Sequence, residues 1–368
     1  RIVTASSDNT ARVWDAQTAD LVLLLSGHDD AVVSALYSPD GVFIVTASHD
    51  CCAQVFYAHD GQLVSKLGPQ PAPLSSARFS PDNCYVLTTC GDEVPRLFET
   101  ESGSMVTQLT GHDSVGRSAS YDPDGSYIVT AGESALAYVW EAKDAAMEAQ
   151  LLGHTASLWC ASYSPDGTRI VTASEDQTAC IFQVETTTLV AQLVGHGNTV
   201  FAACFSPDGS QVLTTSHDHT ARIFRADGGP LGPELDGHSE SVMSASYSPD
   251  GSRIVTASHD GSALVFDSGT GERVVQLSGH ESRVVSASYS PDGRHIVTGS
   301  DDKTARIWDS QSGTLVMTLA AHTDSVASAS YSSDGQYIVT SSADKTVRIW
   351  DSQSGRVLRV LEEHPDRI

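Results

Sequence analysis

The sequence has few basic residues, with 21 Lys and Arg against 46 Asp and Glu and a formal net charge of −25 over 368 residues. Non-specific binding to nucleic acid or to an anionic membrane needs a basic surface, so this deficit argues against both kinds of partner. Long hydrophobic runs are also missing. The apolar run near the start, Leu21–Leu25, is far shorter than the ~20 residues that cross a bilayer. We therefore expect no membrane insertion.

Cysteine is scarce as well, and the seven cysteines are odd in number and show no C-x-x-C spacing. A disulfide framework and a zinc site are therefore not expected, and a reducing, cytoplasmic compartment fits better. The sequence contains no P-loop, no G-x-S-x-G nucleophile elbow and no H-E-x-x-H zinc motif. These absences predict a protein that is not an enzyme and needs no cofactor or metal.

What the sequence does contain is a repeat of 42 residues without any insertion or deletion. Its marker is a Gly-His pair, found at Gly27-His28, Gly111-His112, Gly153-His154, Gly195-His196, Gly237-His238 and Gly279-His280. Pro69-Gln70 fills one slot of the same phase. Apolar residues make up 40% of the chain, enough for packed cores. The equal length of the units leaves no inserted loop to build a substrate pocket.

One unit, residues 153–194, predicts four short strands at residues 158–163, 169–174, 179–183 and 189–193. The turn Ser164-Pro165-Asp166-Gly167 separates the first two, because Pro fixes φ, Asp bonds the backbone ahead of it and Gly accepts φ > 0. No room is left for a helix. A four-stranded sheet that is apolar on both faces must stack on its neighbours, which predicts an all-β propeller of four-stranded antiparallel blades.

The unit resembles the Trp-Asp (WD) repeat, which closes with Trp-Asp, as at Trp14-Asp15, Trp308-Asp309 and Trp350-Asp351. The resemblance covers the whole chain, although five of the nine terminal aromatic residues are Phe. It implies a closed β-propeller and a protein-interaction role. We expect one domain over residues 1–368 with nine blades, and eight blades as the alternative. The closing blade would be split between residues 1–26 and 363–368, with His364 in phase with Thr4, Asp8 and Trp14. Because Arg1 falls in mid-repeat, we expect a segment of a longer protein.

Each unit also places a His, a Thr, an Asp and an aromatic residue in fixed phase. The sets are His154, Thr172 and Asp176; His280, Thr298, Asp302 and Trp308; and His322, Thr340, Asp344 and Trp350. Hydroxyl, imidazole and carboxylate suggest a nucleophilic triad, but a site repeated around a ring is architecture, since catalysis needs one asymmetric pocket. The WD resemblance implies a structural tetrad. It leaves open whether the Thr or the Ser two positions later, such as Ser174, is the bonded hydroxyl.

Two adjacent units depart from this pattern, with Gln70 in place of His and Ser134 in place of Asp. We expect residues 74–151 to be the loosest part of the ring, and Thr298→Ala to be more damaging than Thr88→Ala.

The slot five residues after each His varies while the frame stays constant. It holds Trp159, Phe201 and Met243 on three consecutive units, and the resemblance implies that they open onto the top face around the central channel. With Arg117 and Arg283 they form a candidate partner-binding surface, since aromatic, Met and Arg residues concentrate binding energy. The alternative is that these side chains only fill the channel mouth.

Three histidines, His217, His219 and His259, lie in neighbouring predicted turns on the same face. They could ligate a metal, but we interpret them as solvated loop residues.

The sequence thus predicts a non-catalytic scaffold that binds a partner protein or peptide, as part of a larger signalling chain or complex. The alternative is a structural subunit of a large cytoskeletal or ciliary assembly that binds through its outer rim. A hydrolase would need one exposed, distinct His/Thr/Asp set, and none is evident.

Overall fold

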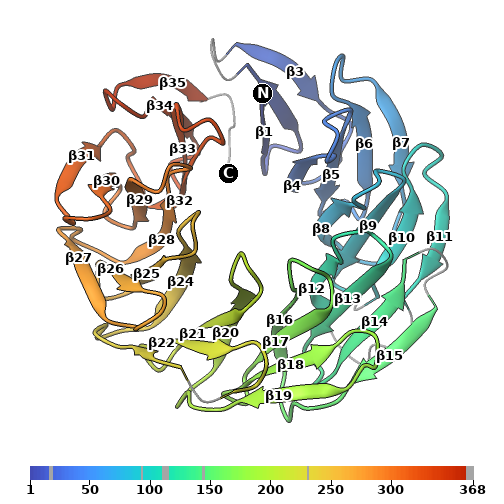
Figure 1. Ribbon diagram of the computed structural model, residues 1–368. Coiled ribbons are helices and arrows are strands. Elements are labelled where there is room, and N and C mark those ends of the chain that lie inside the picture. Colours follow the sequence, from blue (N-terminus) through green and yellow to red (C-terminus); the bar gives the residue numbers. More distant parts are fainter. Residues whose placement is uncertain (16–19, 93, 110–115, 143–145, 230–231, 362–368) are drawn as a thin grey trace. The chain divides into compact units, whose positions relative to one another are not determined.

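The computed structural model describes residues 1–15, 20–92, 94–109, 116–142, 146–229 and 232–361. Strands and turns make up this part of the chain, which forms nine antiparallel sheets and contains no helix (Figure 1). Each sheet corresponds to one 42-residue unit of the sequence. The expected all-β propeller with nine blades is therefore confirmed. Since the described residues hold no helix, they also hold none that could cross a membrane.

The chain forms two compact parts, one mainly of residues 1–172 and the other mainly of residues 190–363. Each part is described by itself. We number the sheets in chain order, from sheet 1 (β1–β3) to sheet 9 (β32–β35).

The strands of the first four sheets are β1 (Ile2–Ala5), β2 (Ala11–Trp14) and β3 (Leu21–Leu25) in sheet 1; β4 (Val32–Tyr37), β5 (Phe43–Ser48), β6 (Ala53–Tyr57) and β7 (Leu63–Leu67) in sheet 2; β8 (Leu74–Phe79), β9 (Tyr85–Cys90), β10 (Arg96–Glu99) and β11 (Met105–Gln108) in sheet 3; and β12 (Gly116–Tyr121), β13 (Tyr127–Gly132), β14 (Ala137–Glu141) and β15 (Met147–Leu151) in sheet 4.

The strands of the other five are β16 (Leu158–Tyr163), β17 (Arg169–Ser174), β18 (Ala179–Gln183) and β19 (Leu189–Leu193) in sheet 5; β20 (Val200–Phe205), β21 (Gln211–Ser216), β22 (Ala221–Arg225) and β23 (Glu234–Leu235) in sheet 6; β24 (Val242–Tyr247), β25 (Arg253–Ser258), β26 (Ser262–Asp267) and β27 (Arg273–Ser278) in sheet 7; β28 (Val284–Tyr289), β29 (His295–Ser300), β30 (Ala305–Asp309) and β31 (Leu315–Leu319) in sheet 8; and β32 (Val326–Tyr331), β33 (Tyr337–Ser342), β34 (Val347–Asp351) and β35 (Val357–Leu361) in sheet 9.

Eight sheets have four strands in consecutive order, and sheet 1 has three among the described residues. This agrees with the sequence count, in which the chain begins at the second strand of a unit. The pairing of residues 363–368 with sheet 1, and with it His364, lies outside the described residues. Ring closure through that segment stays a prediction.

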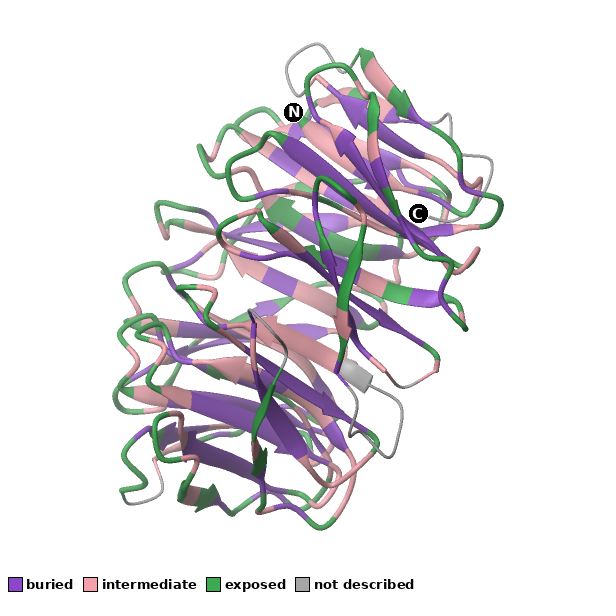
Figure 2. Cartoon of the chain, turned by 90° about the vertical axis from the view of Figure 1, so that its right-hand side faces the viewer, coloured by how far each residue is buried: buried purple, intermediate pink, exposed green. Residues whose placement is uncertain are grey.

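Sheet 8 shows how each unit is built. The second strand, β29, is buried from Ile296 to Ser300, whereas the fourth strand, β31, is mostly exposed. Figure 2, which faces another part of the chain, likewise shows largely buried strands next to largely exposed ones. Neighbouring sheets pack on both faces of sheet 8, so the polar Thr298 and Ser300 are buried together with the apolar residues of β29. One core cluster joins sheets 8 and 9, with Val297 and Ile307 of sheet 8 packed in the same cluster as Val326 and Trp350 of sheet 9. Sheets thus stabilise one another face to face.

The turn between first and second strands forms as its residues predict. In sheet 8, Ser290 Oγ donates to Asp292 Oδ1 at 2.6 Å and accepts the His295 N–H at 2.9 Å. Gly293 adopts φ +71°, a conformation that favours glycine, and its N–H donates to the Ser290 carbonyl at 2.8 Å. The Ser-Pro-Asp-Gly sequence therefore closes a tight loop in which each polar group has a defined role.

The first strands begin with a β-bulge that the sequence did not reveal. In sheet 6, Val200 pairs with Ser216 and Ala202 with Thr215, so Phe201 is the extra residue between them. The same shift occurs in sheet 7, where Met243 is the extra residue between Val242 and Ser244. In a regular strand, successive side chains point to opposite faces of the sheet, and the extra residue of a bulge departs from this alternation. The variable slot is thus a bulge position wherever the described pairing shows this shift, at residues 33, 75, 117, 201, 243, 285 and 327.

Candidate functional site

The His/Thr/Asp/Trp set of sheet 8 forms one continuous hydrogen-bonded chain. Trp308 Nε1 donates to Thr298 Oγ1 at 2.8 Å, and that hydroxyl lies 2.7 Å from His280 Nε2. His280 Nδ1 lies 2.7 Å from Asp302 Oδ2. If Nδ1 carries the proton, each donor meets one acceptor, with the Thr hydroxyl donating to the imidazole. The Thr298 side chain is fully buried, so no substrate reaches its hydroxyl.

Sheet 9 repeats this chain through His322, Thr340, Asp344 and Trp350, with distances of 2.7 to 2.8 Å. Sheets 2, 6 and 7 keep His, Thr and Asp in the same contacts, with Phe where the indole would be.

The remaining predicted members occupy the same positions. In sheet 5, His154 Nε2 lies 2.8 Å from Thr172 Oγ1, and Asp176 Oδ1 accepts the Thr178 N–H at 3.0 Å. In sheet 1, Trp14 Nε1 donates to Thr4 Oγ1 at 2.9 Å. Asp8 accepts a hydrogen bond from the Arg12 guanidinium at 2.6 Å.

The structure decides which hydroxyl joins the histidine. It is the Thr in every described set, while the Ser two positions later has another role. Ser300 Oγ accepts the Asp302 N–H at 3.1 Å and donates to the Ser282 carbonyl at 3.3 Å. The Ser therefore ties the second-to-third strand turn to the preceding loop.

Burial and hydrogen bonding set the charge state of these networks. Burial lowers the pKa of His280 below its usual 6.5 and outweighs the opposing effect of Asp302. Burial would raise the pKa of Asp302, but hydrogen bonds from Thr304 and His280 prevail and hold it at about 2. The network therefore contains a neutral imidazole and a carboxylate at neutral pH, the same charges that a catalytic triad has at rest. The burial of the Thr298 hydroxyl, and not the charge state, is what favours a structural link.

Sheet 3 builds a different network where Gln70 replaces His. Thr88 Oγ1 donates to Gln70 Oε1 at 3.2 Å and to the Arg96 carbonyl at 3.3 Å. The Arg96 guanidinium is buried, pairs with Asp92 and lies 3.1 Å from Cys90 Sγ. An arginine on the third strand thus holds the Asp that histidine holds elsewhere. In sheet 4, Thr130 still accepts the Trp140 indole N–H at 2.8 Å.

Sheet 4 carries a second departure, at its first turn. Asp122 stands where most other units have Ser, and it is 6% exposed. Its Oδ1 accepts the Tyr127 N–H at 2.9 Å, and its carboxyl also bonds that of Asp124. Burial, together with the Asp124 charge, raises the pKa of Asp122 to about 6. A carboxyl can replace the Ser hydroxyl as donor to Asp124 only when it is protonated.

Asp122→Ser should therefore stabilise the chain at pH 7.5 and not at pH 4. Because the folded pKa is raised, the stability linked to this group is complete below the unfolded pKa and is lost as pH rises through about 6. We expect a gain of about 1–2 kcal/mol at pH 7.5 in urea unfolding. The reverse change Ser290→Asp in sheet 8 is the matched control and should be destabilising at pH 7.5. A gain that is the same at both pH values would refute the ionisation argument.

The predicted partner-binding residues lie at the starts of first strands. Phe201 and Met243 are half-buried in the second part of the chain, Arg283 there is exposed, and Trp159 is half-buried in the first part. The Arg117 side chain lies outside the described residues. The Phe201 ring packs at a tilt against the His217 ring, with centroids 3.9 Å apart. The sequence does not predict this contact, although Phe201 and His217 are each candidate residues by their position in the repeat.

A different apolar surface lies on the fourth strands. Leu315 and Val316 of β31 are 45% and 48% exposed, and Leu63 of β7 is 54% exposed. The first two positions of the fourth strand are exposed and apolar in two other sheets, at Met105 and Val106 and at Leu189 and Val190. This outer-strand surface is the structural basis of the rim-binding alternative.

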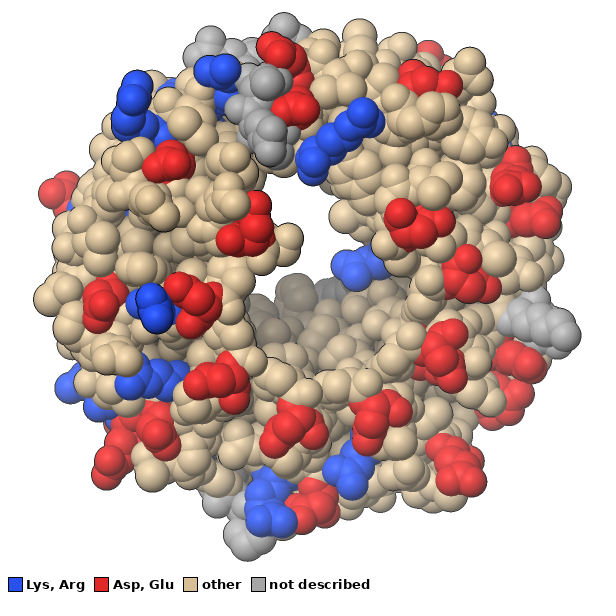
Figure 3. All heavy atoms as spheres, turned by 45° about the horizontal axis from the view of Figure 1, so that its top comes forward, with Lys and Arg blue, Asp and Glu red and all other residues tan. Residues whose placement is uncertain are grey.

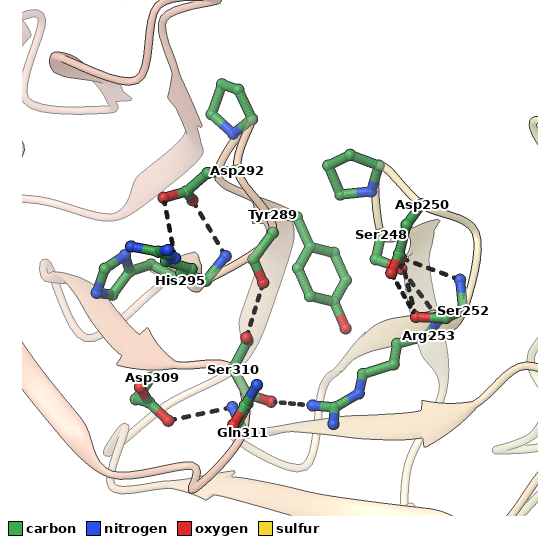
Figure 4. A pocket seen from close by; sticks show the side chains of 14 residues that line it. Ser248, Asp250, Ser252, Arg253, Tyr289, Asp292, His295, Asp309, Ser310 and Gln311 are labelled. Atoms are coloured by element: carbon green, nitrogen blue, oxygen red, sulfur yellow. Dashed lines mark hydrogen bonds and ion pairs between the residues drawn. The ribbon is translucent and has the colours of Figure 1, made fainter.

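A cavity of about 860 Å³ lies between sheets 7 and 8, at the end that carries the Ser-Pro-Asp-Gly turns (Figure 4). Arg253 crosses its floor and donates to the Ser310 carbonyl at 2.8 Å. Asp250, Asp292 and Asp309 line it, but each carboxylate already accepts hydrogen bonds within its own turn. The lining thus consists of turns whose carboxylates are hydrogen-bonded within the same turn, and of Arg253, which links sheets 7 and 8.

Acidic side chains predominate over Lys and Arg on the face shown in Figure 3. Among the described residues, however, no group of three or more His, Cys, Asp or Glu side chains is arranged to hold a metal ion, and this includes His217, His219 and His259.

The family model described as "WD domain, G-beta repeat" (WD40) matches seven segments of the chain, which together cover more than half of it. They are residues 19–57, 103–141, 147–183, 187–225, 229–267, 271–309 and 313–351. Residues 58–102 are not matched, although sheet 3 forms there with four strands. No curated protein matches the sequence.

Among solved structures, a crystal structure of the computationally designed Ika8 protein is similar, with a TM-score of 0.71 and 22% sequence identity. The match covers 89% of this chain and 98% of that one, and at this identity it shows the fold alone. The family match, the fold and the repeated networks agree: this chain belongs to the WD40 repeat family of β-propellers.

Proposed function

We propose that this chain is a non-catalytic interaction scaffold that binds a partner protein or peptide at the starts of its first strands. WD40 propellers generally serve as protein-interaction scaffolds. The observation that carries the proposal is the bulge at which Phe201 and Met243 stand on consecutive sheets, half-buried and turned out of the strand alternation. Aromatic and Met side chains at such positions supply binding energy without disturbing the frame.

The proposal extends to Arg283 of the same part of the chain, and to Trp159 and Arg117 of the first part, as further partner-binding residues. It places the chain in the cytoplasm, within a larger signalling chain or complex. Exposed arginine supports the assignment of Arg283, because arginine is enriched at interfaces.

The alternative is binding through the outer rim, as in a structural subunit of a large cytoskeletal or ciliary assembly. The exposed Leu315 and Val316 favour it, because exposed apolar side chains on an unpaired strand edge invite contact.

Peptides selected from a random display library against the purified chain distinguish the two surfaces. We expect their affinity to fall at least tenfold in a Phe201→Ser, Met243→Ser variant, because loss of central hot-spot side chains costs about that much or more. Trp159→Ser, tested separately, should weaken binding similarly. The matched rim variant, Leu315→Ser with Val316→Ser, should bind as the parent does. Thermal melts establish that each variant is folded. Loss of binding in the rim variant alone would favour the alternative.

A further inference from the structure

His217 and His259 contact Ser241, which directly precedes β24, and His219 lies two residues from His217 on the same loop. His217 and His219 come from the loop between β21 and β22, and His259 comes from the loop between β25 and β26. His217 Nδ1 lies 2.9 Å from Ser241 Oγ, and the Ser241 carbonyl accepts the His259 N–H at 3.1 Å. One serine thus holds the loops of sheets 6 and 7 together and keeps His217 and His259 beside it.

Two apolar residues stand at the bulges of the same two sheets. Phe201 packs against the His217 ring, and Met243 follows Ser241 by two residues at the next bulge. We call Phe201, His217, His219, Ser241, Met243 and His259 the histidine patch. His219 is exposed, and the other five are half-buried, so the patch is open to a partner.

The acidic groups near the patch are mostly engaged elsewhere. Asp218, on the loop of His217, lies 2.7 Å from His196 Nδ1, and Asp260, beside His259, lies 2.9 Å from His238 Nδ1. Glu240, which precedes Ser241, is the exposed carboxylate beside the patch. Asp218 and Asp260 are held by these contacts but keep their negative charge, so the patch has no positive charge of its own above pH 7. Protonation of a histidine side chain in the patch adds positive charge beside Phe201.

The histidines also affect one another. Burial lowers the pKa of His217, and repulsion from His259 and His219 lowers it further. A partner that brings negative charge to the patch would relieve this repulsion. Binding of that partner and uptake of protons would then promote each other, as linkage requires.

We propose that the histidine patch binds an acidic peptide segment with apolar anchor residues, and binds it more tightly below about pH 6. The inference rests on the proposed function, since Phe201 and Met243 are its anchors, and adds the chemistry of the partner and the pH dependence. Apolar side chains of the segment pack on Phe201 and Met243, while its carboxylates face the protonated imidazoles. Charge complementarity is what selects this partner: most of the acidic chain repels such a segment, and this patch attracts it when protonated.

The test uses two synthetic fluorescent peptides of alternating Glu and Leu or of alternating Gln and Leu, measured by anisotropy at pH 7.5 and pH 5.5. We expect the Glu peptide to bind about tenfold more tightly at pH 5.5, because its carboxylates form ion pairs with protonated imidazoles of the patch. The Gln peptide should show no such change. The variant His217→Gln, His219→Gln, His259→Gln should abolish the pH response of the Glu peptide, which controls for the general loss of negative charge at pH 5.5. Circular dichroism at both pH values establishes that each protein is folded.

Three results would overturn the inference: no binding of the Glu peptide at pH 5.5, weaker binding at pH 5.5 than at pH 7.5, or an unchanged pH response in the triple variant. The proposed function fails separately. It fails if library-selected peptides bind the Phe201→Ser, Met243→Ser variant as tightly as they bind the parent, whatever the pH.

Discussion

Thr298→Ala should destabilise the chain by about 2–3 kcal/mol, against about 1 kcal/mol for Thr88→Ala. The Thr298 hydroxyl joins His280 and Trp308 at 2.7 and 2.8 Å, so its removal leaves a buried imidazole nitrogen and a buried indole N–H without that partner. Thr88 holds Gln70 at 3.2 Å, and the aromatic residue of its sheet, Phe98, has no donor to lose. Unfolding in urea, followed by circular dichroism, measures both differences.

Thr298→Ser and Thr88→Ser are the matched controls, because they keep the hydroxyl and remove the methyl group. Thr298→Ser should recover most of the loss. An equal or larger cost of Thr88→Ala would show that sheet 3 depends on its altered network as much as sheet 8 depends on the usual one. The expectation that residues 74–151 are the loosest part of the chain would then be wrong.

Stability should fall steeply as pH drops below about 6.5. Burial lowers the pKa of His28, His238, His280 and His322, so the unfolded chain binds more protons than the folded chain in this range. The stability from each buried neutral histidine is complete above the unfolded pKa and is lost as pH falls toward the folded one, at up to about 1.4 kcal/mol per pH unit for each group. Hydrogen bonds, opposed by burial, hold the pKa of Asp344 at about 2, which extends the loss below pH 4. Asp122 has the opposite effect, because its contribution to stability increases as pH falls. It is one group, however, against four histidines.

Free energies of unfolding in urea at pH 7.5, 6.5, 5.5 and 4.5 measure this slope. His280→Gln should lower stability at pH 7.5 and reduce the slope by up to one proton. His59→Gln is the control, since the His59 side chain is 72% exposed and contacts Asp60 outside the buried networks, and it should change the slope least. A free energy that stays constant from pH 7.5 to pH 5.5 would mean that the buried histidines are as easily protonated in the folded chain as in the unfolded chain.

Much of the fold follows from local chemistry repeated at a constant spacing. The 42-residue period, the Ser-Pro-Asp-Gly turn and the alternating strands predict nine sheets, because each signal acts over a few residues and does not depend on neighbouring sheets. The unit with Gln70 shows that a sheet can form even where the sequence does not match the family pattern. It departs from the family pattern at residues 58–102, yet sheet 3 forms there, with Arg96 binding Asp92 in the place of the missing imidazole.

By itself, the sequence determined the fold class, the number of units and which residue types occupy the network positions. Tertiary structure decided what depends on distances between residues far apart in the chain. It selected Thr298 over Ser300 as the partner of His280, because only the Thr hydroxyl lies within reach of both the imidazole and the indole. It raised the pKa of Asp122 by burying it, and it brought His217 against Phe201 beside Ser241. Burial and contact across loops carry no local signal, so the candidate site took its form only when the sheets were packed.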